Sequence, residues 1–277
     1  MIRGMQLWDT LSPAEQTLVR QALWRSGLAG TVEQYNTGLR WAGAPGAVQR
    51  SLGEAEQRVL VPELAAVLVD LAERGLVVVR MRTGMSAAAT DPVLTEAELL
   101  EVLAEPANWF RRADAAMRFD LDATGIAREW WQDSAVPEEV PDGLPRWDGL
   151  TREQQEVLVC ASEASGLLTG PFGVLADLPD GLTGAELTDW LDEQLAPLVE
   201  FVGRGWLEVR HFATSSGSAY TVVPQAQLRT AFADRELRHD DGDEWGVGFT
   251  CVFTYAGLGV WRGSGWGAAW GSTLRFD

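Results

Sequence analysis

Apolar residues recur at helical spacing twice along the chain, each time after the same short motif. Trp-Asp-x-Leu followed by Ser or Thr stands at residues 8–12 and again at residues 147–151. A capping box follows in each copy, Ser12-x-x-Glu15 and Thr151-x-x-Gln154, and this pattern begins helices because the two side chains satisfy amide groups at the helix start. The sequence therefore predicts a helix after each motif, with a buried side formed by Leu18, Val19, Ala22 and Leu23 or by Val157, Leu158 and Ala161.

Two further blocks repeat in the same order. Residues 73–80 match residues 203–210, and in both a helix is predicted to end at a glycine, directly before a β-rich run. Thr124-Gly125-Ile126 matches Ala256-Gly257-Leu258. Because three blocks recur in one order, we expect the chain to contain an internal duplication.

Each copy is predicted to run helix, irregular connector, helix, helix, strand, turn, strand, helix, strand. The capping boxes Ser51-x-x-Glu54 and Thr183-x-x-Glu186 are predicted to begin the helices that lead into the repeated glycines. In the second copy, residues 206–212 and 219–223 predict a hairpin with a Ser/Gly turn. A stretch rich in Pro and acidic residues, 135–145, is predicted to link the copies.

This order of elements resembles the winged-helix superfamily of helix-turn-helix proteins. The resemblance is carried by residues 198–210, where hydrophobic and polar positions alternate up to a glycine and a hydrophobic residue. It implies an α+β fold with two tandem winged-helix-like domains, residues 1–134 and residues 146–277, the second ending in a Gly/Trp-rich tail. The resemblance bears on the fold and carries no function by itself.

The helices that would enter a DNA groove are acidic in both copies. By the resemblance they span Pro62–Glu73 and about Glu193–Val202, and neither contains an arginine. Base readout uses mainly Arg, Lys, Asn and Gln, and carboxylates repel the phosphates beside the groove. A sequence-specific DNA reader is therefore disfavoured. The tandem, acidic architecture is similar to that of the kleisin-interacting subunits of bacterial condensin-like complexes, and the resemblance implies a protein-binding role.

Charge supports the same interpretation. The chain carries 40 acidic and 22 basic residues, a net charge of −18, and both halves are acidic. All the basic residues are arginine, and this composition is typical of a GC-rich bacterial genome. The surface offers little attraction to a phosphate backbone, although arginines gathered from distant segments into one stripe would reverse that conclusion. No apolar run is long enough to span a bilayer and no signal peptide is evident, so we expect an intracellular, cytoplasmic protein.

Two motifs suggest enzymes, and we reject both. Asp120-Leu121-Asp122-Ala123-Thr124 is similar to the DxDxT motif of haloacid-dehalogenase-type phosphatases, which also need a downstream cation and a further acidic pair. We interpret Asp120 and Asp122 as outward-facing acids on a sheet edge. Gly257-x-Gly259-x-x-x-Gly263 has the wrong spacing for a dinucleotide-binding turn, and no amphipathic helix is predicted after it.

The remaining polar residues predict no catalytic arrangement. His211 and His239 lie far apart in sequence, and neither can be matched to a nucleophile and an acid. Cys160 and Cys251 fall on apolar segments and are interpreted as core residues. We therefore expect no enzyme activity, no metal and no cofactor.

Two segments are candidates for binding a partner. The Gly-rich tail carries Trp261, Trp266 and Trp270, whose rings are expected to dock back onto the domain; the alternative is that they anchor a partner. An acidic turn carries Asp240, Asp241, Asp243 and Glu244, and it is interpreted as a hydrated turn whose charges suit a basic partner.

The sequence thus predicts a non-catalytic intracellular protein-binding module, an accessory or regulatory subunit of a larger complex, whose partner is another, possibly basic, protein. One alternative is an immunity protein or antitoxin that neutralises a basic effector. A second alternative is a winged-helix DNA-binding transcriptional regulator. The oligomeric state and the identity of the partner are left open.

Overall fold

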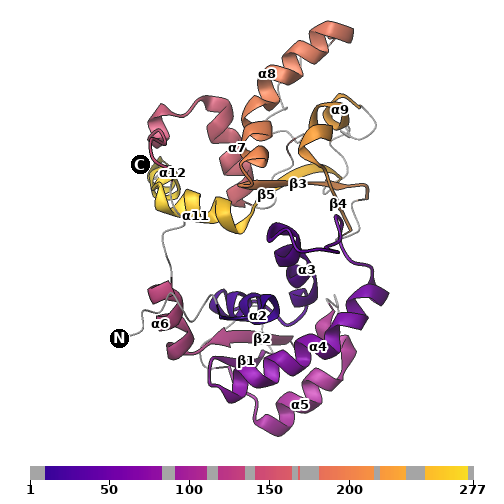
Figure 1. Cartoon of the computed structure of the whole chain (residues 1–277), viewed down its shortest axis with the longest axis vertical. Helices are drawn as coiled ribbons and strands as arrows, with labels where there is room; N and C mark the ends of the chain where they lie inside the picture. The colour runs from indigo at the N-terminus through magenta and orange to yellow at the C-terminus, as the bar shows by residue number, and fades with distance from the viewer. Residues whose placement is uncertain are drawn as a thin grey trace. The chain divides into compact units, whose positions relative to one another are not determined.

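The computed structural model describes residues 10–82, 91–110, 118–134, 141–163, 168, 181–214, 219–234 and 247–273. The chain divides into two compact units (Figure 1). Unit 1 consists of residues Met1–Val48 and Leu52–Val136, and unit 2 of Gln49–Ser51 and Pro137–Asp277. The boundary at Val136 falls inside the stretch rich in Pro and acidic residues. Both units combine helices with a small sheet, which is an α+β arrangement.

Unit 1 contains a two-stranded sheet surrounded by helices. Its elements in chain order are α2 (Pro13–Leu23), α3 (Thr31–Trp41), α4 (Glu54–Glu73), β1 (Val77–Arg82), α5 (Glu96–Ala104), a 3₁₀ turn (Pro106–Trp109), β2 (Arg118–Ala123) and α6 (Gly125–Ser134). Strands β1 and β2 pair antiparallel, from Val77 opposite Ala123 to Arg82 opposite Arg118. Gly27 forms a bridge on the outer side of β2, and Val93 forms one on the outer side of β1.

The core of unit 1 lies between one face of this sheet and the apolar sides of the helices. Val77 and Val79 of β1 and Leu121 of β2 are buried there together with leucines of α2 and α4. Trp109, which is fully buried, packs into the same core and donates a hydrogen bond from Nε1 to the carbonyl oxygen of Leu103 (3.2 Å). The alternation of buried and polar residues along β1 follows from the two-residue period of a strand.

Unit 2 has a three-stranded antiparallel sheet in the order β4–β3–β5. Its elements are a 3₁₀ turn (Trp147–Gly149), α7 (Arg152–Glu163), α8 (Gly184–Gly203), β3 (Leu207–Phe212), β4 (Thr221–Val222), a second 3₁₀ turn (Gln225–Gln227), α9 (Leu228–Ala233), β5 (Gly248–Phe253), α11 (Tyr255–Gly263) and α12 (Trp266–Thr273). The short segment Gln49–Ser51, which belongs to unit 2, lies along β4 through an antiparallel bridge between Arg50 and Thr221. The predicted hairpin over residues 206–223 is therefore present as β3 and β4.

The end of the described chain folds into unit 2. Trp261 and Trp266 are buried in its core, and Trp266 donates a hydrogen bond from Nε1 to the carbonyl oxygen of Pro145 (2.9 Å). The motif Gly257-x-Gly259-x-x-x-Gly263 lies within α11, and α12 follows it, so the Gly-rich stretch interpreted as a tail is helical. Buried tryptophan rings stabilise these helices despite their glycines, which disfavour a helix in isolation.

The predicted capping boxes have mixed outcomes. Those at Ser12 and Thr151 are confirmed, with hydrogen bonds from the amide of Glu15 to Ser12 Oγ (3.3 Å) and from the amide of Gln154 to Thr151 Oγ1 (3.2 Å). The box at Ser51 is wrong, because α4 begins after Gly53, whose amide is bound by Glu56 Oε2 (2.8 Å). The spacing alone did not identify where α4 begins, because polar residues three apart also occur by chance before a helix.

The predicted DNA-reading helices are the second halves of longer helices. Pro62 lies inside α4 and Glu193 lies inside α8, and each helix is continuous over 20 residues. The prediction of a separate helix beginning at either residue is wrong. Pro62 and Pro197 are tolerated within their helices, so neither proline ends one. Strand β2 also follows α5 instead of returning directly from β1, so β1 and β2 are not a simple hairpin.

Candidate functional site

The face of the β1–β2 sheet that points away from the core carries charged residues. Arg80 and Arg82 alternate with the buried valines of β1, and Asp120 and Asp122 alternate with Leu121 on β2. In the register of the sheet, Arg80 is directly opposite Asp120, and Arg82 is opposite Arg118. The opposite charges of Arg80 and Asp120 favour this pairing, whereas the like charges of Arg82 and Arg118 oppose it.

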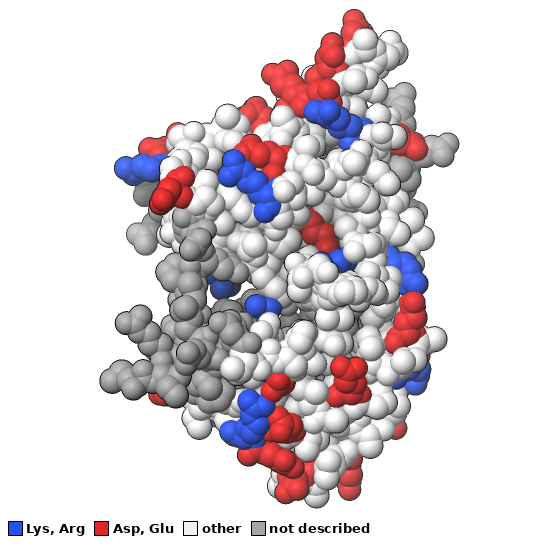
Figure 2. Space-filling model, viewed as in Figure 1, with Lys and Arg blue, Asp and Glu red and all other residues white. Residues whose placement is uncertain are grey.

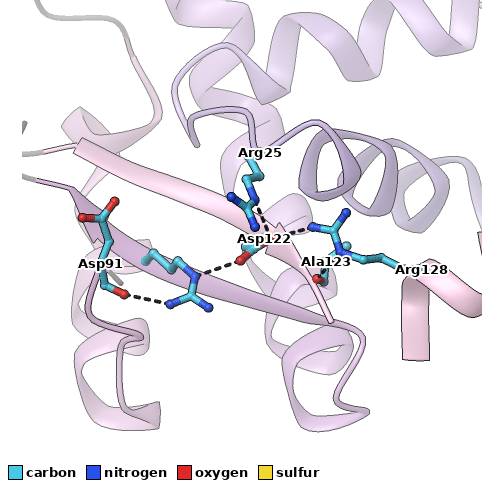
Figure 3. Close-up of polar contacts among 6 residues, drawn as sticks. Arg25, Asp91, Asp122, Ala123 and Arg128 are labelled. Carbon is cyan, nitrogen blue, oxygen red and sulfur yellow. Dashed lines mark hydrogen bonds and ion pairs between the residues drawn. The ribbon is translucent and has the colours of Figure 1, made fainter. Parts of the chain in front are cut away.

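Asp122 is bound by three arginines from three different parts of unit 1. Its Oδ1 accepts hydrogen bonds from Arg25 Nε (3.3 Å) and Arg128 Nη2 (2.8 Å), and its Oδ2 accepts one from Arg80 Nε (2.8 Å). Arg25 follows α2, Arg80 lies on β1 and Arg128 lies on α6. Figure 3 shows Arg25 and Arg128 converging on the carboxylate from separate elements. We call these four residues the Asp122 cluster.

Backbone carbonyls fix two of the three arginines further. Arg128 donates from Nε to the carbonyl oxygen of Ala123 (3.1 Å), and Arg80 donates from Nη1 to that of Asp91 (2.8 Å) (Figure 3). The Asp122 side chain is only 8% exposed, whereas those of Arg25 and Arg128 are 44% and 38% exposed. The carboxylate is therefore buried beneath guanidinium groups that remain in contact with solvent.

The pKa of Asp122 is set by two opposing effects. Burial of the carboxylate raises the pKa, while the hydrogen bonds from Arg80 and Arg128 and the charge of Arg25 lower it. The arginines prevail, and the pKa of Asp122 lies below its ordinary value. Asp122 is therefore ionised at neutral pH, and the cluster is a charged assembly.

Asp120 lies beside this cluster in a less favourable environment. Its carboxylate forms an ion pair with Arg82 Nε at 3.0 Å, but neither of its oxygens has a hydrogen-bond partner among the residues that the structure describes. Burial raises the pKa of Asp120, the charge of Arg82 lowers it and the nearby charge of Asp91 raises it further, so the pKa ends above its ordinary value. The pKa values of two aspartates on one strand are thus shifted in opposite directions.

The prediction that Asp120 and Asp122 face outward from a sheet edge is wrong. Both are buried, and β2 lies between β1 and the bridge at Gly27, so it is an inner position of the sheet. The alternation Val-x-Val-Arg-x-Arg in residues 77–82 was the available signal, because a strand with one apolar face puts those arginines on the opposite face. Arg25 and Arg128 had no such signal, since only tertiary folding brings them to the strand.

The Asp122 cluster is built for electrostatic binding. Guanidinium groups provide fixed hydrogen-bond donors for carboxylates and phosphates, and Arg stays charged at any physiological pH. The cluster has no Ser, Cys or His side chain that could act as a nucleophile or as a general base near neutral pH. Within the part of the chain that the structure describes, no group of three or more metal-binding side chains is assembled.

A second charged surface lies on α8. Its exposed carboxylates Glu186, Asp189 and Glu193 are spaced three and four residues apart, which places them on one side of the helix. The opposite side of α8 is buried in the core through Leu191, Leu195, Leu198 and Phe201. The 20 residues of α8 include no basic residue. In Figure 2, acidic side chains gather at the top of the view, where Figure 1 places α8.

The residues predicted to bind a partner are placed only in part. Trp261 is 9% exposed and Trp266 is 1% exposed, so these two rings are docked in unit 2, as expected for the tail. The side chain of Trp270 lies outside the described part of the structure, as does the turn with Asp240, Asp241, Asp243 and Glu244. Because they are buried, Trp261 and Trp266 are not available to anchor a partner.

The histidines and cysteines are placed as follows. His211 lies on β3 with its ring 4.9 Å from that of Phe249, and His239 lies outside the described residues. Cys160 and Cys251 are both buried, and burial raises the pKa of the Cys251 thiol well above its ordinary value. A buried thiol with a raised pKa is a poor nucleophile, which agrees with a core position.

Comparison with known proteins returned no relative. No protein-family model, curated protein or solved structure matches the chain. Among the described residues, no helix has the length and apolar character to cross a membrane.

Proposed function

We propose that the chain is a non-catalytic, intracellular protein-binding module that acts as an accessory or regulatory subunit and contacts a basic protein partner. The acidic side of α8 is the surface that carries this proposal. Glu186, Asp189 and Glu193 are exposed, and within the described residues none of them is engaged in an ion pair. A row of unpaired charges of one sign attracts a partner of the opposite sign and speeds association with it.

The same surface argues against the DNA-binding alternative. Glu193 and Glu200 lie in the half of α8 that a winged-helix DNA reader would insert into the major groove. The gathering of arginines in unit 1 favours the alternative, but the face also contains the buried carboxylates of Asp120 and Asp122. Among the described residues the face is thus mixed in charge, without the continuous positive stripe that a nucleic-acid reader requires.

Binding to a basic probe tests this proposal. A synthetic oligo-arginine peptide should bind the full chain, and the variant Glu186→Gln/Asp189→Asn/Glu193→Gln should bind it at least about tenfold more weakly. The control variant Glu73→Gln/Glu96→Gln/Glu101→Gln removes the same charge from exposed positions of α4 and α5 and should keep most of the affinity.

Two outcomes would contradict the proposal. Equal losses in both variants would show that only net charge matters, and no specific surface would be involved. Tight binding of a DNA duplex that weakens steeply with salt would favour the regulator instead. Both an immunity protein and a subunit of a complex are expected to bind a basic partner, so this experiment does not separate the two roles. Binding to a purified basic toxin would separate them.

We also propose that the two units arose by internal duplication of a winged-helix-like ancestor. The support is a set of matching hydrogen bonds. Thr124 Oγ1 donates to the carbonyl oxygen of Gly75 (2.7 Å), and Thr254 Oγ1 donates to that of Gly205 (2.5 Å). These bonds pair Thr124 with Thr254, so the predicted match of Thr124 with Ala256 is wrong by two residues. Profile comparison of the two halves against homologous sequences tests the duplication.

A further inference from the structure

The Asp122 cluster contains more positive charge than its carboxylate can neutralise. Three guanidinium groups surround one carboxylate, which leaves two positive charges in a chain whose net charge is −18. Like charges held close together repel one another, so this local excess favours the binding of an anion.

The fold of the sheet does not require this excess. On the corresponding face of the unit 2 sheet, Glu208 Oε1 accepts a hydrogen bond from Arg210 Nε (2.8 Å), and this pair is neutral. The two sheets have the same strand pairing, from Val77 opposite Ala123 and from Leu207 opposite Phe253. Antiparallel pairing of this kind therefore does not require Arg25 and Arg128.

Two partly exposed arginines of the cluster keep unused hydrogen-bond donors. In its contacts with the described residues, Arg25 uses Nε alone, and Arg128 uses Nε and Nη2. The two Nη groups of Arg25 and Nη1 of Arg128 are left to bind a ligand, since a guanidinium group has five N–H donors. Both arginines bind Oδ1 of Asp122, so their guanidinium groups are neighbours.

Asp122 also holds these groups in position before any ligand arrives. A free arginine side chain loses rotamer freedom when it binds an anion, and a side chain already fixed by a carboxylate loses less. Arg128 is fixed a second time, by the carbonyl oxygen of Ala123. Tetrahedral phosphate oxygens match such fixed, adjacent guanidinium groups because each oxygen accepts charge-assisted hydrogen bonds.

We propose that Arg25 and Arg128, positioned by Asp122, form a binding site for a phosphate group, either free phosphate or the phosphate of a small ester. Arg80 lies below the site, with its side chain 22% exposed, and contributes positive charge from β1. The site is independent of the acidic side of α8, and its existence does not depend on the protein-binding role proposed above.

Calorimetric titration with inorganic phosphate at constant ionic strength tests the site. The full chain should bind phosphate saturably, and Arg25→Gln/Arg128→Gln should weaken binding by at least about tenfold, as the loss of two charge-assisted partners implies. The control Arg146→Gln/Arg152→Gln removes two arginines of unit 2 that are 91% and 76% exposed, and it should leave the affinity unchanged. A parallel titration with a phosphate monoester separates the two sources of the group.

Protection from chemical modification extends the test to the unaltered chain, in case the double variant fails to fold. Phenylglyoxal modifies accessible arginines, and phosphate should protect Arg25 and Arg128 but not Arg146. Non-saturable binding, or equal protection of all three arginines, would overturn the proposal. So would binding of a DNA duplex that the double variant abolishes while inorganic phosphate does not compete, because the ligand would then be a nucleic acid.

Discussion

The two units share one antiparallel strand pair, β1–β2 in unit 1 and β3–β5 in unit 2, and carry different side chains on it. In both, a long helix ends at a glycine, the next strand pairs antiparallel with a later one, and a threonine caps the helix that follows. The amides of Ala127 and Gly257 donate to the capping hydroxyls of Thr124 and Thr254. The backbone plan is shared down to these individual hydrogen bonds.

The outer faces of the two sheets differ most. In unit 1 the face carries Asp120 and Asp122 with several arginines, whereas unit 2 has Thr250 and Val252 at the corresponding positions of its strand. Arg210 of unit 2 pairs with Glu208 and stacks over Tyr220, its guanidinium 4.3 Å from the ring centre. The outer face of the unit 2 sheet therefore carries a neutral ion pair and an aromatic ring, whereas that of the unit 1 sheet carries an excess of arginines. The same strand pairing is therefore compatible with different charges on this face.

The largest predicted effects come from the buried tryptophans. Trp109→Ala in unit 1 and Trp266→Ala in unit 2 should each cost about 3–5 kcal/mol, because each removes a large ring that is at most 1% exposed. Hydrogen exchange resolved by residue checks the comparison. The loss should be confined to the unit that carries the substitution, and a loss spread over both would show that the units unfold together.

Removing the carboxylate from each sheet comes next. Asp122→Asn should lower the free energy of unfolding by about 3 kcal/mol, since it leaves three arginines facing one another around a neutral group. Glu208→Gln should cost only about 1 kcal/mol, because Arg210 keeps its stacking on Tyr220. Urea unfolding measures both variants. Equal losses in the free energy of unfolding would mean that the extra arginines of unit 1 do not repel one another measurably.

The helix that follows the last strand offers a third contrast. A Cβ atom at Gly257 would lie 1.9 Å from the carbonyl oxygen of Trp206, so Gly257→Ala should cost about 2–3 kcal/mol as α11 is forced away from β3. Unit 1 already has Ala127 at the matching position, and Ala127→Gly should cost about 1 kcal/mol through lost helix propensity. Thermal unfolding of the two variants checks the difference, and a harmless Gly257→Ala would refute the close approach.

The smallest effect is on the dependence of stability on pH. The pKa of Asp122 is lowered in the folded chain, so its contribution is complete above the ordinary aspartate pKa of about 4 and is lost as the pH falls through the lower folded value. Asp120 has a raised pKa, so it destabilises the folded chain above about pH 4, and protonation relieves that cost. Urea midpoints measured from about pH 6 to about pH 3 should fall less steeply for Asp122→Asn than for the wild type. An unchanged slope would contradict the assignment of Asp122 as the paired carboxylate.

Local patterns in the sequence were sufficient for much of the secondary structure. The capping boxes at Ser12 and Thr151, the glycines at which α4 and α8 give way to strands, and the hairpin of unit 2 all follow from residues close together in the chain. Helix starts and turns depend on hydrogen bonds among neighbouring residues, so their signals are local. The same logic failed where a local pattern was ambiguous, as at Ser51 and Pro62.

Tertiary structure alone decided the candidate site and the fate of the tail. The arginines that bind Asp122 come from residues 25, 80 and 128, and no short-range pattern in the sequence joins them. The burial of Trp266 depends on Pro145 and on strands that fold from other parts of the chain. Charge and aromatic content are fixed by the sequence, but whether a carboxylate is buried under arginines or hydrated at an edge depends on which distant elements pack over it.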